Sequence, residues 1–176
     1  MSLKSDKLRS LIHEKRLFLD GGMGTVLLSM LPEGVGFENV TLQRPEIITS
    51  VHRAYLEAGS DIITSNTFSV NPDKYDDYEE RIKIAMYAAK NAASDFEKNS
   101  DRDVFIAFDI GPTGRLMKPM GDMSFEEALG IFGENVRLAV KYGADLILIE
   151  TMTDITELKA AVTASKMFSD LPVFAT

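Results

Sequence analysis

Short apolar runs alternate along this chain with longer amphipathic stretches, and this alternation limits the fold more than any other feature. A short apolar run indicates a strand that is buried on both faces, whereas apolar residues every three or four positions indicate a helix. Strands and helices in strict alternation are typical of a parallel sheet with helical crossovers. The expected strands lie at 17–19, 62–63, 104–108, 146–149 and 173–175, and the expected helices at about 5–15, 45–58, 79–97, 124–142 and 154–168.

One segment of the chain resembles another at a fixed offset. Residues 59–63 (GSDII) align with residues 143–147 (GADLI) at a spacing of 84, or two units of 42, and this alignment places Asn66 on Glu150. Such a repeat predicts either a (β/α)8 barrel or a doubly wound sheet. The 176 residues hold four units and a fifth strand. Because a complete barrel needs roughly 250 residues, the chain is either a five-stranded open sheet or about half of a barrel.

Residues at the expected helix ends support these boundaries. The segment 124–127 (SFEE) has the form of a capping box, and Asp154 with Glu157 offers a weaker version. Gly59 and Gly143 stand where helices should end and the chain should turn into a strand. No linker interrupts the series, so we expect no internal domain boundary.

Composition excludes several classes of function. The net charge of −8 argues against a nucleic-acid footprint or a basic membrane surface. No apolar run approaches the roughly 18 residues of a membrane-spanning helix, and no secretory signal is evident, so a cytoplasmic protein is expected. The absence of cysteine excludes thiolate chemistry and cysteine-based metal sites within these residues. Of the two histidines, His52 lies mid-helix and is expected to be structural or solvated.

Polar residues follow the expected strands at their carboxyl ends. They are Asp20, Asn66 with Thr67, Asp109 and Glu150. In both candidate folds these strand ends share one edge, where ligands bind. Three carboxylates and an amide would suit an ammonium group, although Asp and Asn are also common turn and cap residues. Glu150 is the sharper candidate, because glutamate is a poor cap.

Two glycine-rich segments follow expected strands. The segment 20–25 (DGGMGT) matches neither a dinucleotide-binding motif nor a P-loop, so its amides are expected to meet a small anion such as a carboxylate rather than a phosphate. The segment 109–114 (DIGPTG) reads either as a second loop of the site or as a tight turn. Residues 115–123 are expected to form a loop that covers the mouth.

These motifs, taken together and in this order, resemble the homocysteine S-methyltransferase family. The closest resemblance is to the N-terminal homocysteine-binding module of cobalamin-dependent methionine synthase, and it runs from about Lys15 to Thr176. It implies an α/β fold, a (β/α)8 TIM barrel of roughly 300 residues. This chain would then be about the first half, with an N-terminal helical segment at 1–15 and the first five strands within 16–176.

The resemblance also implies roles for particular residues. Asp20 and Glu150 match positions that hold the amino group of homocysteine, and the Gly-rich turn would help to bind its amino-acid end. Ser69 departs from the family, in which glycine is common at that position. The substrate-binding residues expected on this basis are Asp20, Gly21, Gly22, Met23, Gly24, Asn66, Thr67, Phe68, Asp109 and Glu150.

The implied reaction transfers a methyl group to the sulfur of homocysteine, giving methionine. The resemblance implies a zinc ion held by three cysteines of late strands, so the zinc ligands are expected beyond Thr176 and this chain should be inactive alone, with no catalytic or metal-binding residue of its own. The donor is expected to be methylcobalamin, recharged from methyltetrahydrofolate by other domains. The alternatives are a betaine- or sulfonium-dependent homocysteine methyltransferase and a non-catalytic five-stranded α/β domain that binds a small molecule.

Overall fold

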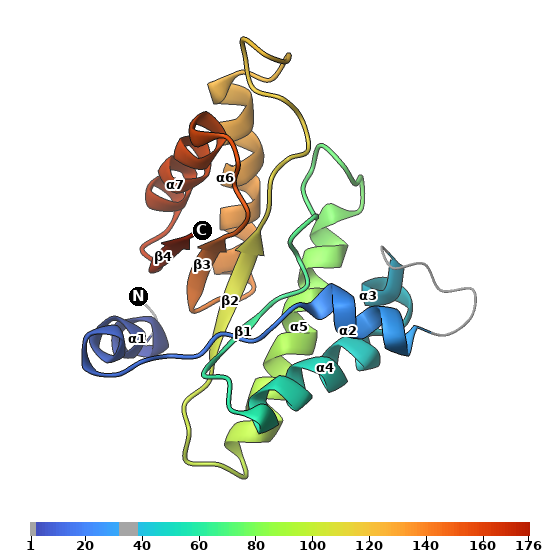
Figure 1. The fold of residues 1–176 in the computed structure, drawn as a ribbon, viewed down its shortest axis with the longest axis vertical. Helices are drawn as coiled ribbons and strands as arrows, with labels where there is room; N and C mark the ends of the chain where they lie inside the picture. Colours follow the sequence, from blue (N-terminus) through green and yellow to red (C-terminus); the bar gives the residue numbers. More distant parts are fainter. Residues whose placement is uncertain (1–2, 32–38) are drawn as a thin grey trace.

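The computed structural model describes residues 3–31 and 39–176 (Figure 1). Helices and strands alternate from residue 45 onward, as the apolar pattern predicts. The elements are α1 (Leu3–Glu14), α2 (Met23–Met30), α3 (Val40–Gln43), α4 (Pro45–Ala58), β1 (Ile62–Thr64), α5 (Tyr78–Glu97), β2 (Phe105–Ile110), α6 (Phe125–Lys141), β3 (Leu146–Ile149), α7 (Ile155–Phe168) and β4 (Val173–Ala175).

The four strands form one parallel sheet in the order β1-β2-β3-β4. Each strand therefore pairs with the next one along the chain, and the order nowhere reverses within the described residues. A doubly wound sheet needs such a reversal, because its helices cover both faces. A sequential order with right-handed crossovers puts the connecting helices on one face only, which is the arrangement of a barrel wall.

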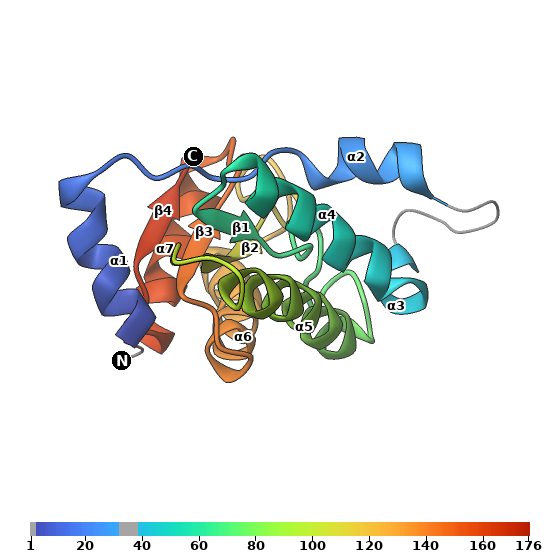
Figure 2. The same ribbon diagram turned by 90° about the horizontal axis from the view of Figure 1, so that it is seen from below.

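The two faces of the sheet pack against different partners. Ile106, Phe108 and Ile147 belong to the large cluster that joins the sheet to helices α5, α6 and α7. Phe105 and Leu148 point the other way and pack with α1. Figure 2 shows α1 beside β4, on the side away from α4 and α5. The crossover helices thus cover the outward face, while the inward face that would line a barrel is covered by α1.

The first expected strand is realised only in part. Instead of a strand at 17–19, the chain makes a single parallel bridge between Leu19 and Ile62. The carbonyl of Phe18 accepts from the amides of Asp61 and Ile62 at 2.8 and 3.1 Å, so the segment lies where a strand beside β1 would lie. Pairing stops there because the chain enters α2 at Met23. In the part of the chain that the structure describes, the sheet has four strands and this bridge instead of the five strands expected. Helices α2 and α3 were not expected.

The predicted helix ends are confirmed with one change. Ser124 and Glu127 form the complete capping box, and Gly59 and Gly143 adopt positive φ angles of 116° and 73°. Asp154 caps α7 by accepting from the amides of Thr156 and Glu157. The Glu157 carboxylate does not return the bond, because it is turned toward another loop.

Among residues 3–31 and 39–176, no helix has both the length and the apolar character that a membrane span needs.

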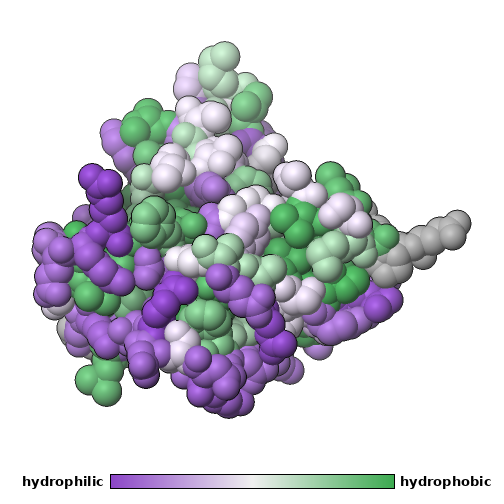
Figure 3. Space-filling model, turned by 60° about the horizontal axis from the view of Figure 1, so that its bottom comes forward, coloured by the Kyte–Doolittle hydropathy of each residue, from purple (hydrophilic) through white to green (hydrophobic). Residues whose placement is uncertain are grey.

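The open edges of the sheet should make the protein associate with itself. Phe18 beside β1 is 63% exposed, and Leu28 on α2 is 72% exposed. Figure 3 shows apolar residues gathered on the surface around α2, next to the grey segment. Unpaired strand edges and exposed apolar surface favour association between copies. Sedimentation velocity over a range of concentrations should show species larger than a monomer, and a stable monomer at every concentration would contradict this prediction.

Candidate substrate-binding site

A cavity of about 580 Å³ opens at the carboxyl ends of the strands. It collects residues from the 17–24 segment and from the ends of β1, β2 and β3. Every substrate-binding residue expected from the sequence lines it except Thr67. The lining residues are Leu19, Asp20, Gly21, Gly22, Met23, Gly24, Thr64, Ser65, Asn66, Phe68, Ser69, Asp109, Leu148, Glu150 and Thr151.

Two of the three carboxylates converge because strand side chains alternate between faces. Along β2, Phe105 and Ala107 face inward, and Asp109 is the next residue in that series. Along β3 the inward residues Leu146 and Leu148 lead to Glu150 in the same way. Both acids therefore continue the inward face at its carboxyl end.

Asp20 is placed beside these two acids by hydrogen bonds from β1 and not by strand alternation. Its carboxylate accepts from the amide of Thr64 at 2.9 Å and from the Thr64 hydroxyl at 2.6 Å, which ties the 17–20 segment to β1. Burial raises the pKa of Asp20 to about 6, against the two hydrogen bonds from Thr64, and the charge of Glu150 adds to the rise. At neutral pH Asp20 is therefore mostly ionised.

Asp109 is the most buried of the three acids. Its side chain is 4% exposed, and its Oδ1 atom has no hydrogen-bond partner. Burial raises the pKa of Asp109 to about 8, with further contributions from the charges of Glu150 and Asp20 and from a side-chain hydrogen bond with Glu150. Asp109 is therefore mostly protonated at neutral pH.

The Gly-rich segment becomes the start of a helix. Helix α2 begins at Met23, so Met23 and Gly24 lie in its first turn. Gly22 is the N-cap and has no side chain that could cap the helix. The amides of a first turn have no partner within the helix, and they attract an anion. Gly21 passes close to a tyrosine: a Cβ there would lie 2.9 Å from the hydroxyl of Tyr55.

The segment after β1 supplies one structural residue and two lining residues. Thr67 is fully buried, and its hydroxyl donates to the backbone carbonyl of Asp109, so it braces the site without lining it. The amide of Asn66 donates to Thr41 of α3 at 2.9 Å. Phe68 is 39% exposed at the cavity.

Gly111 gives Phe68 its place, and a side chain there should disturb it. A Cβ at Gly111 would lie 2.6 Å from both the ring and the carbonyl oxygen of Phe68, and the Gly111 amide donates to that carbonyl. Gly111→Ala should therefore destabilise the fold by about 1–3 kcal/mol, as overpacking typically does. Gly130→Ala in α6 is the control, since nothing lies near its Cβ and alanine favours a helix. Thermal unfolding should show a lower Tm only for Gly111→Ala, and equal values for both variants would contradict this prediction.

Some lining residues were not singled out in the sequence. Thr64 carried a signal, because it follows Ile62 at the strand period of two. Thr151 follows Glu150 in the motif that resembles the family, although no binding role was expected for it. It has a φ of 60°, which is rare for a β-branched residue and is found at functional sites. The remaining lining residues not expected from the sequence are Leu19, Ser65, Ser69 and Leu148.

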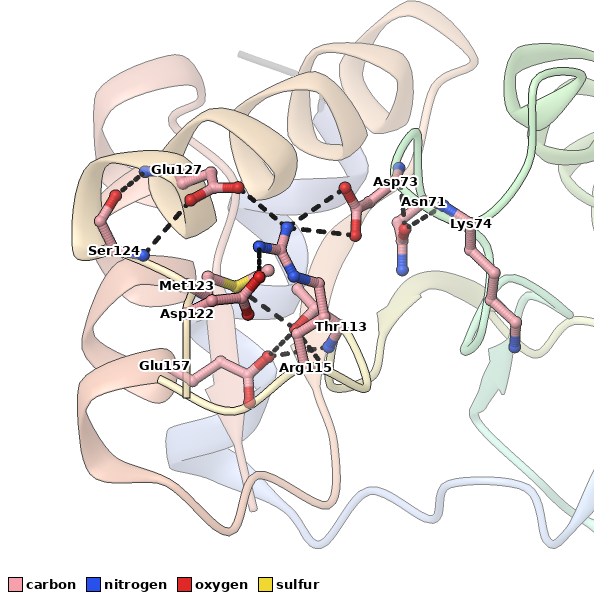
Figure 4. Close-up of polar contacts among 10 residues, drawn as sticks. All are labelled: Asn71, Asp73, Lys74, Thr113, Arg115, Asp122, Met123, Ser124, Glu127 and Glu157. Carbon is pink, nitrogen blue, oxygen red and sulfur yellow. Dashed lines mark hydrogen bonds and ion pairs between the residues drawn. The ribbon is translucent and has the colours of Figure 1, made fainter. Parts of the chain in front are cut away.

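The 115–123 loop does not cover the cavity, contrary to the sequence-based expectation, since none of its residues lines it. Figure 4 shows Arg115 paired with Glu127 of α6 at 2.8 Å and with Asp122 at 2.9 Å. Nearby, the amide and hydroxyl of Thr113 donate to the buried carboxylate of Glu157 at 2.8 and 2.6 Å. These bonds fasten the loop to α6 and α7 instead.

The residues of this chain do not fit a zinc site. The sequence contains no cysteine, and no group of three or more potential metal ligands is arranged to hold an ion in residues 3–31 and 39–176. Of the three acids at the cavity, Asp20 is held by two hydrogen bonds from Thr64, and the Oδ1 atom of Asp109 is buried without a partner. Carboxylates can bind a cationic group and the free amides of a first helical turn can bind a small anion, so these are the ligand groups that the arrangement suits.

Known proteins share both the sequence pattern and the fold. A family model described as homocysteine S-methyltransferase matches residues 17–176. Two structures of the homocysteine methyltransferase MmuM from Escherichia coli superpose on the chain. The oxidized form matches 96% of this chain with a TM-score of 0.83 and 21% sequence identity. The metallated form matches 94% of this chain with a TM-score of 0.81 and 20% sequence identity. The chain spans 64% of the length of either. This likeness confirms the prediction of a partial (β/α)8 barrel. Because the family model covers nearly the whole chain, this protein belongs to the homocysteine S-methyltransferase family.

Proposed function

We propose that this chain binds the amino-acid end of L-homocysteine and forms part of an enzyme that methylates the homocysteine sulfur to give methionine. The observation that carries this proposal is the separation of charge within one cavity. Asp20 and Glu150 supply negative charge at the strand ends, and the uncapped start of α2 supplies free amides. An α-amino acid carries the complementary pair of an ammonium and a carboxylate.

The ammonium and the carboxylate of the ligand would be bound by different kinds of interaction. The ammonium lies between Asp20 and Glu150, where charge-assisted hydrogen bonds are about twice as strong as neutral ones. The carboxylate lies at the first turn of α2, where the helix dipole and unpartnered amides favour an anion. Phe68 packs beside the ligand, and Gly111 makes room for Phe68.

The sulfur end is not assigned to residues of this chain. The family is zinc-dependent in general, and zinc coordination would keep the homocysteine thiol deprotonated. Since the residues here do not fit zinc, we propose that its ligands lie in residues beyond Thr176 of a longer protein. Residues 16–176 would then be the first half of the barrel, and this chain alone would transfer no methyl group.

We propose methylcobalamin, recharged from methyltetrahydrofolate by other domains, as the methyl donor. This choice rests on the likeness of four segments, 20–25, 65–68, 109–114 and 150–151, to the methionine synthase module. A sulfonium or betaine donor is the alternative, and supplying each donor to the longer protein with homocysteine would decide between them by methionine formation. We also propose a cytoplasmic location and no nucleic-acid partner, on the basis of the net charge of −8.

A binding experiment tests the proposal directly. Calorimetry on the protein should detect L-homocysteine, and should detect little or no binding of 4-mercaptobutanoate, which has the same thiol and carboxylate but lacks the amino group. A hydrogen bond to a charged group contributes about 1.5–3 kcal/mol, so the difference in affinity should be at least tenfold. Equal affinity for the two compounds, or binding of neither, would refute the proposed site.

A further inference from the structure

Asp109 and Glu150 are two carboxyl groups on the inward face of neighbouring strands, because the register pairs Asp109 with Leu148, two residues before Glu150, and both acids line the cavity. The Oδ1 atom of Asp109 is buried there without a hydrogen-bond partner. An ionised carboxylate only accepts hydrogen bonds, so a bond between two carboxyl groups requires a proton on one of them. We propose that Asp109 is a neutral carboxylic acid that donates this proton to Glu150 and so positions Glu150 to receive the ammonium group of the ligand. This inference rests on the proposed function and assigns Asp109 a positioning role instead of direct binding.

Burial decides which of the two acids carries the proton. Asp109 is 4% exposed and its Oδ1 atom is buried without a partner, whereas Glu150 is only partly buried at the cavity. An ionised carboxylate with an unpartnered buried oxygen is strongly disfavoured, and a neutral acid tolerates that environment far better. The proton therefore belongs on Asp109, and Glu150 keeps the charge.

The surroundings of Asp109 favour the same state. Its strand places it on the inward face near Glu150, which directly follows β3, and Asp20 lines the same cavity from the segment before α2. The charges that act on Asp109 come from Glu150 and Asp20, and both are negative. From the β1 side the neighbours are hydroxyls: Thr67 donates to the Asp109 carbonyl, and the Ser65 hydroxyl accepts from its amide. Neither hydroxyl bond compensates a charge on the Asp109 side chain.

A neutral Asp109 lowers the number of negative charges in the cavity and so matches the cavity to a ligand with a single ammonium group. Two ionised acids, Asp20 and Glu150, face the ligand instead of three. Two carboxylates converge on one ammonium group, and a third charge would lie next to them without a partner. The donated proton also fixes the orientation of the Glu150 carboxylate before the ligand arrives, which lowers the cost of ordering it on binding.

Infrared spectroscopy tests the proton without any ligand. At pH 7 the protein should show the carbonyl stretch of a protonated carboxylic acid, and this band should disappear in Asp109→Asn. Asp20→Asn is the matched control and should keep the band, because Asp20 is mostly ionised at that pH. Absence of the band in the protein, or its survival in Asp109→Asn, would overturn the proposal.

Calorimetry with L-homocysteine tests the positioning role. Asp109→Ala should weaken binding by about tenfold or more, since a donor to a charged group is lost, and Asp109→Asn should restore it to within about threefold, since an amide also donates to Glu150. If Asn weakens binding as much as Ala, Asp109 acts as an anion and the proposal is wrong. If the unsubstituted protein takes up no homocysteine, the proposed function fails, and the infrared comparison alone upholds or overturns the neutral acid.

Discussion

Between pH 7 and pH 4 the protein should lose about 3 kcal/mol of unfolding free energy through one buried histidine. His52 of α4 is fully buried, and neither of its ring nitrogens has a hydrogen-bond partner. Burial lowers the pKa of His52 from 6.5 to about 4. The unfolded chain therefore takes up a proton near pH 6.5, while the folded protein resists protonation until about pH 4. The contribution of His52 to stability is complete above pH 6.5 and falls as the pH drops through this window.

The substitution His52→Leu isolates this contribution. Leucine cannot be protonated and leaves no polar atom unpartnered in the interior, so the variant should be at least as stable at pH 7 and should not share the acid loss. Urea unfolding of both proteins at pH 7 and pH 4 should give a difference in stability that grows by about 3 kcal/mol on acidification. Parallel pH profiles for the two proteins would show that His52 is not held neutral by the fold.

Two acids at the cavity should act in the opposite direction. The pKa values of Asp20 and Asp109 are raised to about 6 and about 8, so their neutral forms are favoured in the folded protein. Their contribution to stability is complete below the unfolded value of 3.8 and is lost as the pH rises through these folded values. The unsubstituted protein should therefore be less stable at pH 9 than at pH 7, and Asp109→Asn should reduce that difference. Urea unfolding at the two pH values measures it.

The parts of the fold that follow from periodicity could be predicted from the sequence. The branched apolar runs of β2 and β3 are buried on both faces, which is why their type and position were evident. The period of two also carries Asp109 and Glu150 to the same inward edge. Helix caps could be predicted equally well, since the capping box of Ser124 and Glu127 depends only on residues three apart in sequence.

The parts that depend on contacts between distant segments could not be predicted. Thr67 resembles a site residue, yet its hydroxyl bonds to the Asp109 backbone across 42 residues of chain and leaves the cavity. The 115–123 loop is held away from the mouth by ion pairs of Arg115 and by the bond between Thr113 and Glu157, none of which has a local sequence signal. Segment 17–19 was predicted to be a full strand because its residues are apolar. It forms only one bridge, and the hydrogen bond that ties Asp20 to Thr64 joins residues 44 apart, which no local pattern indicates.

Replacing Glu150 by glutamine should weaken the binding of L-homocysteine by about 10- to 150-fold. This range corresponds to the 1.5–3 kcal/mol that a hydrogen bond to a charged group contributes. Glutamine keeps the size of the side chain and one acceptor oxygen, so the loss measures charge instead of shape. The proposed hydrogen bond from Asp109 to Glu150 is also compatible with the change, because a glutamine carbonyl can still accept it. The fold should therefore survive the change, and a Tm close to that of the unsubstituted protein would verify this.

The control for this substitution must change the net charge equally and leave the cavity untouched. Glu134→Gln does so, because Glu134 is exposed on α6 and pairs with Arg137 outside the site. A protein with a net charge of −8 attracts any cation weakly, and both variants reduce that general field to the same extent. Only Glu150→Gln should therefore lower the affinity measured by calorimetry. If both variants bind L-homocysteine as tightly as the unsubstituted protein, the ammonium group does not lie on Glu150, and Asp20 is the remaining ionised carboxylate at the cavity that can hold it.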